Sequence, residues 1–232
     1  MELKKIVAVR VLSDKDQQTV NRKLYDAVCR QDLPVVKEAI RQGAELNVFH
    51  TESRLIGLYQ SHPKSPLQKA IKNKWGAGVT ELLKVGATPD LVSPMGRTAL
   101  WYALDKYDIF SLQASPEQIS RYDIVFPDAE ALIKSGANLA LNFFYVRKLD
   151  DTAENSAVAE YLKIKGAKIE DALYYALKYG AENSDKKDAW TAAIRITQRE
   201  DQCNVEVAID RLTEEGISID SDQLPRELQR ER

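Results

Sequence analysis

Six apolar stretches of this 232-residue sequence end in the same way, with a glycine followed by alanine or, once, by isoleucine. These endings are Gly43-Ala44, Gly86-Ala87, Gly136-Ala137, Gly166-Ala167, Gly180-Ala181 and Gly216-Ile217. A glycine just past a helix supplies the left-handed residue that closes the last turn, a conformation that other residues adopt at a cost in free energy. The recurrence therefore predicts a chain of repeated helical units, each closed by a glycine.

The predicted helix beginnings agree with these endings. Ser65 offers a hydroxyl that can cap a helix, and Pro66 suits the first helical position. Leu67 and Ala70 follow at the spacing of an inward face, with the small alanine where neighbouring helices approach closely. The segment that starts at Thr98 repeats this arrangement, and it begins 33 positions after Ser65.

These residues resemble the ankyrin repeat family, whose units carry T-P-L-H-x-A in the first helix and L-L-x-x-G-A at the end of the second. The segment Leu82-Leu83-Lys84-Val85-Gly86-Ala87 matches the second motif. Apolar residues stand at the family's offsets before Gly43 as well, namely Leu24, Ala27, Val35, Val36 and Ile40. The resemblance implies an all-α fold, an ankyrin-like helical repeat solenoid of about five units with insertions and capping helices.

The intervals between the glycines are irregular, which indicates insertions. We expect these at 48–64, at 107–128 and at 179–204, and the spacing of Trp190, Ala193, Ile194 and Thr197 predicts an additional helix in the last one. The expected organisation is an N-terminal arm and cap at 1–20, a repeat domain at 21–220 and a charged C-terminal tail at 221–232. The predicted units lie near 21–47, 65–90, 98–140, 141–170 and 171–220.

Composition excludes several classes of partner. With 33 basic and 35 acidic residues the net charge is -2, so no overall basic field exists to hold a nucleic acid. No apolar run approaches the roughly 18 residues of a membrane span, so we expect no membrane insertion. Cys29 and Cys203 form no C-x-x-C pair and suit a reducing compartment. A cytoplasmic location is expected, with a trimmed export signal left open.

The residues that could carry chemistry are few. His50 and His62 are the two histidines, and no cysteine or closely spaced carboxylate completes a tetrahedral zinc site around them. Asp150, Asp151 and Glu154 form the densest acidic cluster, at a predicted helix start where carboxylates stabilise the first turn. No phosphate-binding loop or nucleophile motif occurs. We therefore expect no catalytic residue, no metal site and no cofactor.

The candidate binding residues are exposed positions of the predicted inner helices and loops. The family resemblance implies contacts from the second unit through His62, Lys64, Lys72 and Asn73, and from the third through Met95, Arg97, Asp105 and Lys106. Aromatic side chains dominate protein contacts when they are exposed. That adds Trp101, Tyr102, Tyr175 and Tyr179, for which packing in the core is the alternative.

The expected function is a protein–protein interaction module. The divergent repeats are more typical of bacterial proteins, which favours an inhibitor or immunity protein that binds and blocks a toxin or enzyme. A secreted effector or regulatory scaffold of the ankyrin type is a second possibility. A small hydrolase with an unrecognised acidic site is the alternative from another class.

Overall fold

The computed structural model describes residues 12–51, 62–105, 127–149, 153–183, 186–199, 203–219, 222 and 224–229. This part of the chain is all-α, and its single β-type pairing is an isolated antiparallel bridge between His50 and Lys64. The helices are α1 (Asp14–Arg30), α2 (Leu33–Arg41), α3 (Pro66–Lys72), α4 (Gly76–Lys84), α5 (Ala99–Asp105), α7 (Pro127–Lys134), α8 (Leu139–Lys148), α9 (Ala153–Ile164), α10 (Ile169–Glu182), α11 (Lys187–Arg199), α12 (Val205–Glu214) and α13 (Arg226–Gln229).

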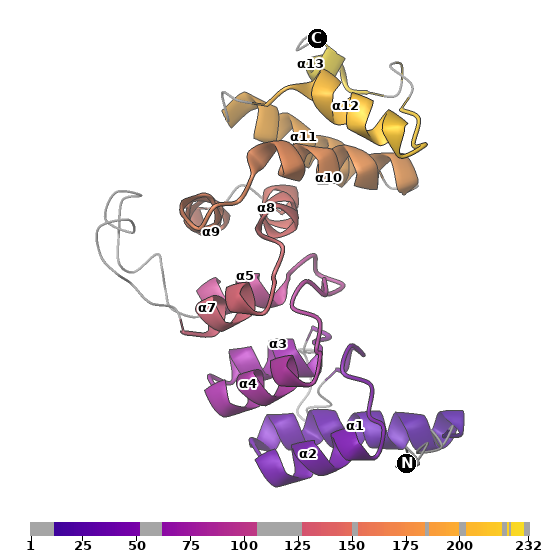
Figure 1. Cartoon of the computed structure of the whole chain (residues 1–232), viewed down its shortest axis with the longest axis vertical. Coiled ribbons are helices and arrows are strands. Elements are labelled where there is room, and N and C mark those ends of the chain that lie inside the picture. The colour runs from indigo at the N-terminus through magenta and orange to yellow at the C-terminus, as the bar shows by residue number, and fades with distance from the viewer. Residues whose placement is uncertain are drawn as a thin grey trace, which may run out of the picture.

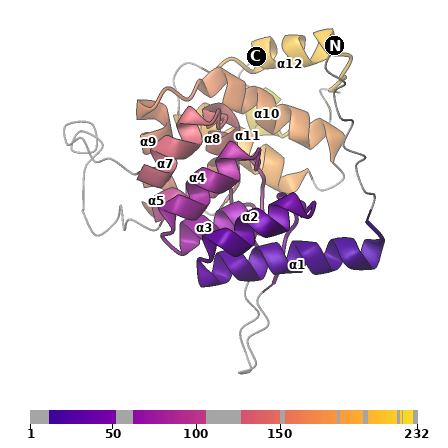
Figure 2. The same ribbon diagram turned by 60° about the horizontal axis from the view of Figure 1, so that its bottom comes forward.

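Consecutive helices pair, and the pairs lie one above another along the long axis of the molecule (Figure 1). The pairs are α1 with α2, α3 with α4, α5 with α7, α8 with α9 and α10 with α11. The first helices of successive pairs also contact one another: α1 contacts α3, α3 contacts α5, and α8 contacts α10. The later helix α12 packs on α10. The helix axes change direction along the stack, as a turned view shows (Figure 2).

Five of the six predicted glycine endings are confirmed. Gly43, Gly86, Gly136, Gly166 and Gly216 have φ between 80° and 96°. At each ending two N–H groups satisfy carbonyls that the helix leaves unpaired. In the second pair, for example, Gly86 N–H donates to Leu83 at 3.1 Å and Ala87 N–H donates to Leu82 at 2.9 Å.

Gly180 was expected to end a helix, and this prediction is wrong. The residue lies inside α10, which continues to Glu182 and is capped by Asn183. Gly180 is needed for space, because a Cβ atom there would lie 2.6 Å from Cζ3 of Trp190. Trp190 belongs to α11, the additional helix that the sequence predicted between 179 and 204 and that the structure confirms.

The helix beginnings follow the predicted caps. Ser65 and Gln68 form a reciprocal capping box at α3, with Pro66 in the first turn. Ser13 caps α1, a single helix that runs across the expected boundary between 20 and 21. α8 begins at Leu139, two residues before the boundary predicted near 141, and Asn138 caps it.

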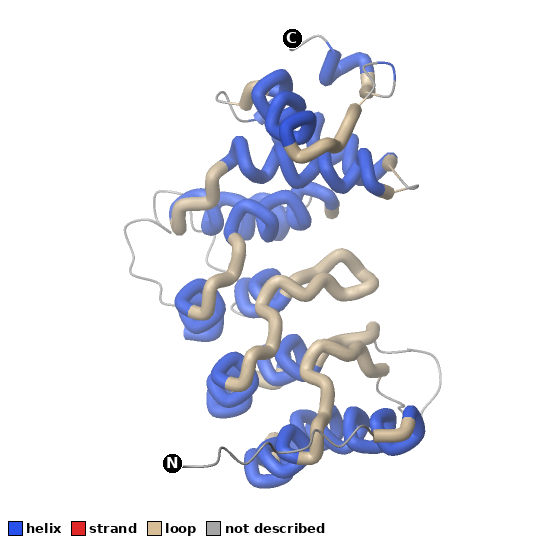
Figure 3. Tube along the Cα trace, turned by 45° about the vertical axis from the view of Figure 1, so that its right-hand side comes forward, coloured by secondary structure: helices blue, strands red, loops and turns tan. Residues whose placement is uncertain are grey.

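The connections after the glycine endings differ in length. After Gly43 and Gly86 the chain forms extended loops before the next helix, and Figure 3 shows these loops on one side of the stack. After Gly136 and Gly166 the next helix begins three residues later. Most of the insertion expected at 107–128 and the middle of that at 48–64 lie outside the described residues, as do 1–11 and the acidic residues Asp150 and Asp151.

One apolar core runs through the stack from Leu24 to Leu228. Ala70 and Ala103 are fully buried in α3 and α5, as expected for close helix contacts. At the C-terminus, Leu224 and Leu228 are buried and α13 packs on α11. Residues 224–229 therefore close the end of the core, whereas the charged sequence suggested a free tail.

The contact between Gly180 and Trp190 provides a test of the packing. We expect Gly180→Ala to lower the free energy of unfolding by about 1 to 3 kcal/mol, because the new methyl group overlaps the indole ring. Gly76→Ala is the control, since a Cβ atom at Gly76 meets nothing within 4 Å. Urea unfolding followed by far-UV circular dichroism measures both; equal stability of the two variants would contradict the packing.

Candidate protein-binding surface

Side-chain hydrogen bonds between layers fix the loops beside the helices. Buried Gln68 donates to the carbonyl oxygens of Leu91 at 2.8 Å and Arg97 at 3.3 Å. Further along the stack, Asp90 accepts from the N–H of Asn138 at 2.9 Å and from the amide of Asn142 at 2.7 Å. Burial raises the pKa of Asp90, although both hydrogen bonds oppose that shift. The loops consequently have defined positions relative to α3 and α8.

Four predicted contact residues come together at the base of these loops. The Nζ atom of Lys64 lies 5.9 Å from the ring centre of Tyr102, whose ring is perpendicular to that of Trp101 at 5.3 Å. The guanidinium of Arg97 lies 4.0 Å from the ring of Trp101. Such cation–π contacts stabilise packed aromatic rings.

The cluster is mostly interior. Trp101 and Tyr102 are each 5% exposed, and Lys64 is 2% exposed. Trp101 and Tyr102 therefore pack in the core, which was the alternative to a surface position, and Lys64 is buried although it was predicted as a contact residue. Arg97 is half-buried, and its Nε atom has no hydrogen-bond partner in the described structure.

The other predicted residues of the first half are scattered. His62, Lys72 and Met95 are exposed. Asn73 ties α3 to α1, since its amide donates to the carbonyl of Val28 at 3.3 Å. The side chain of Asp105 and all of Lys106 lie outside the described residues. The structure thus places no exposed aromatic residue beside Lys72 in this half of the described chain.

A second aromatic group lies on α8 and α10, and we name Tyr145, Lys148 and Tyr179 the tyrosine patch. The rings of Tyr145 and Tyr179 meet edge to face at 6.4 Å, and the Lys148 Nζ lies 4.2 Å from the centre of the Tyr179 ring. All three side chains are partly exposed. Burial, and then proximity to Tyr179, raises the pKa of the Tyr145 phenol. Tyr175 is separately engaged, since its hydroxyl accepts from Asn138 at 2.8 Å.

The sequence predicted only Tyr179 of this patch. Tyr145 and Lys148 are three residues apart in α8, which places them on the same side of a helix. That signal was present in the sequence. It was missed because the contact offsets of the ankyrin family were applied only to the second and third predicted units.

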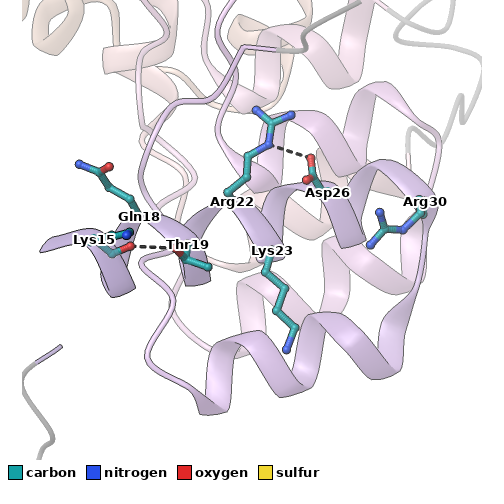
Figure 4. A pocket seen from close by; sticks show the side chains of 7 residues that line it. All are labelled: Lys15, Gln18, Thr19, Arg22, Lys23, Asp26 and Arg30. Atoms are coloured by element: carbon teal, nitrogen blue, oxygen red, sulfur yellow. Dashed lines mark hydrogen bonds and ion pairs between the residues drawn. The ribbon is translucent and has the colours of Figure 1, made fainter. Parts of the chain in front are cut away.

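A shallow groove of about 550 Å³ lies along α1 (Figure 4). Its lining residues are Lys15, Gln18, Thr19, Arg22, Lys23, Asp26 and Arg30. We name this surface the basic α1 face, because four of its side chains are cationic and one is anionic. The carboxylate is paired within the groove, with 3.0 Å between Arg22 Nε and Asp26 Oδ1. This surface was not predicted from the sequence.

The described residues contain no group of three or more His, Cys, Asp or Glu side chains that could hold a metal ion. None of the described helices is long and apolar enough to cross a membrane. Comparison of the chain with models of known protein families gives no match, and comparison with curated protein sequences gives none either.

His50 makes the stability of the loop region depend on pH. Its ring packs 4.9 Å from that of Tyr25, and its Nε2 atom is buried without a hydrogen-bond partner in the described structure. Burial lowers the pKa of His50, and the nearby Arg22 lowers it further, while Asp26 acts in the opposite direction. The unfolded chain therefore binds a proton at a higher pH than the folded chain does.

We expect the free energy of unfolding to fall as the pH decreases through about 6.5, the ordinary pKa of histidine, until the folded protein also takes up the proton. His50→Phe keeps the ring packing and removes this dependence. His62→Asn, a change at an exposed side chain, is the control and should retain it. Urea unfolding between about pH 5 and pH 8 measures the effect, and identical pH profiles of wild type and His50→Phe would contradict it.

Proposed function

We propose that this chain is a protein-binding module built from ankyrin-like helical repeats and that it acts by binding another protein rather than by catalysis. The motif resemblance in the first half and the five equivalent glycine endings support this proposal. Stacked repeats form extended surfaces that suit protein partners.

The observation that carries the proposal is the tyrosine patch. Tyrosine provides a large contact area with few rotatable bonds, and it is enriched at the residues that dominate binding energy. Contact with Phe144, 5.8 Å from Tyr179 between ring centres, orients the Tyr179 ring before any partner arrives. The patch therefore offers a preorganised aromatic anchor with a cation beside it.

We further propose that binding is inhibitory and that the module blocks the active site of a toxin or enzyme. This form of the function has its own test: the purified chain is added to the purified partner, and the partner's activity is measured. Inhibition at a one-to-one ratio supports an inhibitor or immunity protein. Full activity of the bound partner indicates a scaffold or effector role instead.

We expect Tyr179→Ala to weaken capture of the partner by at least about tenfold, because truncation of a central aromatic anchor commonly costs about 2 kcal/mol or more. Tyr179→Phe keeps the ring and should retain most of the binding. The measurement is affinity capture from lysate of the source organism with quantitative mass spectrometry, followed by surface plasmon resonance with the identified protein.

Lys84→Glu is the control variant, since Lys84 is exposed on α4, outside the patch. Thermal melts of all variants show whether the fold is kept. The proposal is wrong about the anchor if a folded Tyr179→Ala protein binds the same partner with unchanged affinity.

A further inference from the structure

Two helices at opposite ends of the stack, α1 and α12, each carry an outward surface on which one sign of charge predominates. The basic α1 face belongs to the first helix, whereas α12 lies at the far end of the long axis (Figure 1). Three exposed carboxylates, Glu206, Asp210 and Glu214, follow one another along α12 at intervals of four residues. We name them the acidic α12 stripe.

The stripe faces away from the core. Residues four apart lie on the same side of a helix, and the buried residues of α12, Val205, Ala208 and Leu212, occupy the opposite side. None of the three carboxylates forms an ion pair within the part of the chain that the structure describes, whereas Arg211, also on α12, pairs with Asp171 of α10. Val207 beside the stripe is 59% exposed, the largest exposed fraction among the large apolar residues described.

The basic α1 face has the corresponding arrangement. Lys15, Arg22, Lys23 and Arg30 lie on the side of α1 that is opposite to buried Leu24 and its buried neighbours. At a rise of about 1.5 Å per residue, Lys23 and Arg30 are about 10.5 Å apart along the axis. The acidic α12 stripe spans about 12 Å by the same measure. The two helices thus present side chains of opposite charge on their outward sides.

We propose that copies of this chain associate head to tail, with the basic α1 face of one copy docked on the acidic α12 stripe of the next. Since the two surfaces lie at opposite ends of the stack, one molecule cannot satisfy both by itself. A contact between two different surfaces of identical chains leaves one of each unused at the ends, so it can add further copies. The inference is independent of the tyrosine patch and of the proposed function.

The overall charge of the chain is consistent with a second copy as the partner. A net charge of -2 over 232 residues gives little repulsion between copies. Because every copy of the chain carries both surfaces, the two surfaces are always present at equal concentration. Exposed charges contribute chiefly to orientation and association rate, so we expect a weak and salt-dependent contact.

Sedimentation velocity of the full chain is the first measurement, over about 10 µM to 1 mM protein, the range in which weak contacts dissociate. We expect the weight-average sedimentation coefficient to rise with concentration at about 0.1 M salt. The rise should disappear at about 1 M salt, where the screening length decreases from about 10 Å to about 3 Å. A monomer at every concentration in low salt would overturn the proposal.

Charge reversal at each end identifies the surfaces. Lys23→Glu with Arg30→Glu makes the basic α1 face acidic, and Glu206→Lys with Asp210→Lys makes the acidic α12 stripe basic. Each double variant alone should remain monomeric, because its two ends then carry the same sign. A one-to-one mixture of the two variants should associate again, since opposite ends are restored between molecules.

Lys84→Glu with Lys134→Glu is the matched control: it changes the net charge by the same amount as the first double variant, at exposed positions on α4 and α7. This control should associate like the wild type at about 0.1 M salt. Circular dichroism melts confirm that each variant is folded. Association that survives in either end variant alone, or a mixture that stays monomeric, would show that these two surfaces do not meet.

Discussion

The left-handed glycine after a helix is the constraint on which the stack depends. At five positions it lets two successive N–H groups turn back onto the last carbonyls of the helix, so the chain leaves each helix in a similar direction. Because Ala87 and its counterparts come immediately after the glycine and are largely buried at most endings, the exit is also packed against the core. A repeated exit direction is what allows successive helix pairs to lie on one another.

The length of the connection after a glycine ending differs along the stack. Trp101 and Tyr102 are buried, and the cations of Lys64 and Arg97, which come just before α3 and α5, lie against their rings. After Gly136 the connection to α8 is short, and α8 contacts α10 directly. The exposed aromatic surface is consequently formed by helices, and the tyrosine patch lies there.

Local signals in the sequence predicted most of the helices, because caps and glycine endings act over a few residues. The capping box at Ser65 and the spacing around Trp190 are of this kind. The failures are of another kind. Gly180 resembles a helix ending, and only the ring of a residue ten positions later reveals its role. Similarly, the burial of Tyr102 depends on loop packing, which a repeat offset does not encode.

The charges on the terminal helices can be compared with what capping of the stack requires. A terminal helix of a stack must present a polar outer face, because an apolar one would remain exposed to water. Capping requires polarity but no particular sign, and a mixture of lysine and glutamate would serve equally well. The basic α1 face has four cations and one anion, although Asp14 and Asp16 are also exposed in the first turn of α1. On α12 the row from Glu206 to Glu214 is anionic, and Arg211 of the same helix pairs with Asp171. The proposed head-to-tail contact gives the difference in sign between these two surfaces a role that capping alone does not.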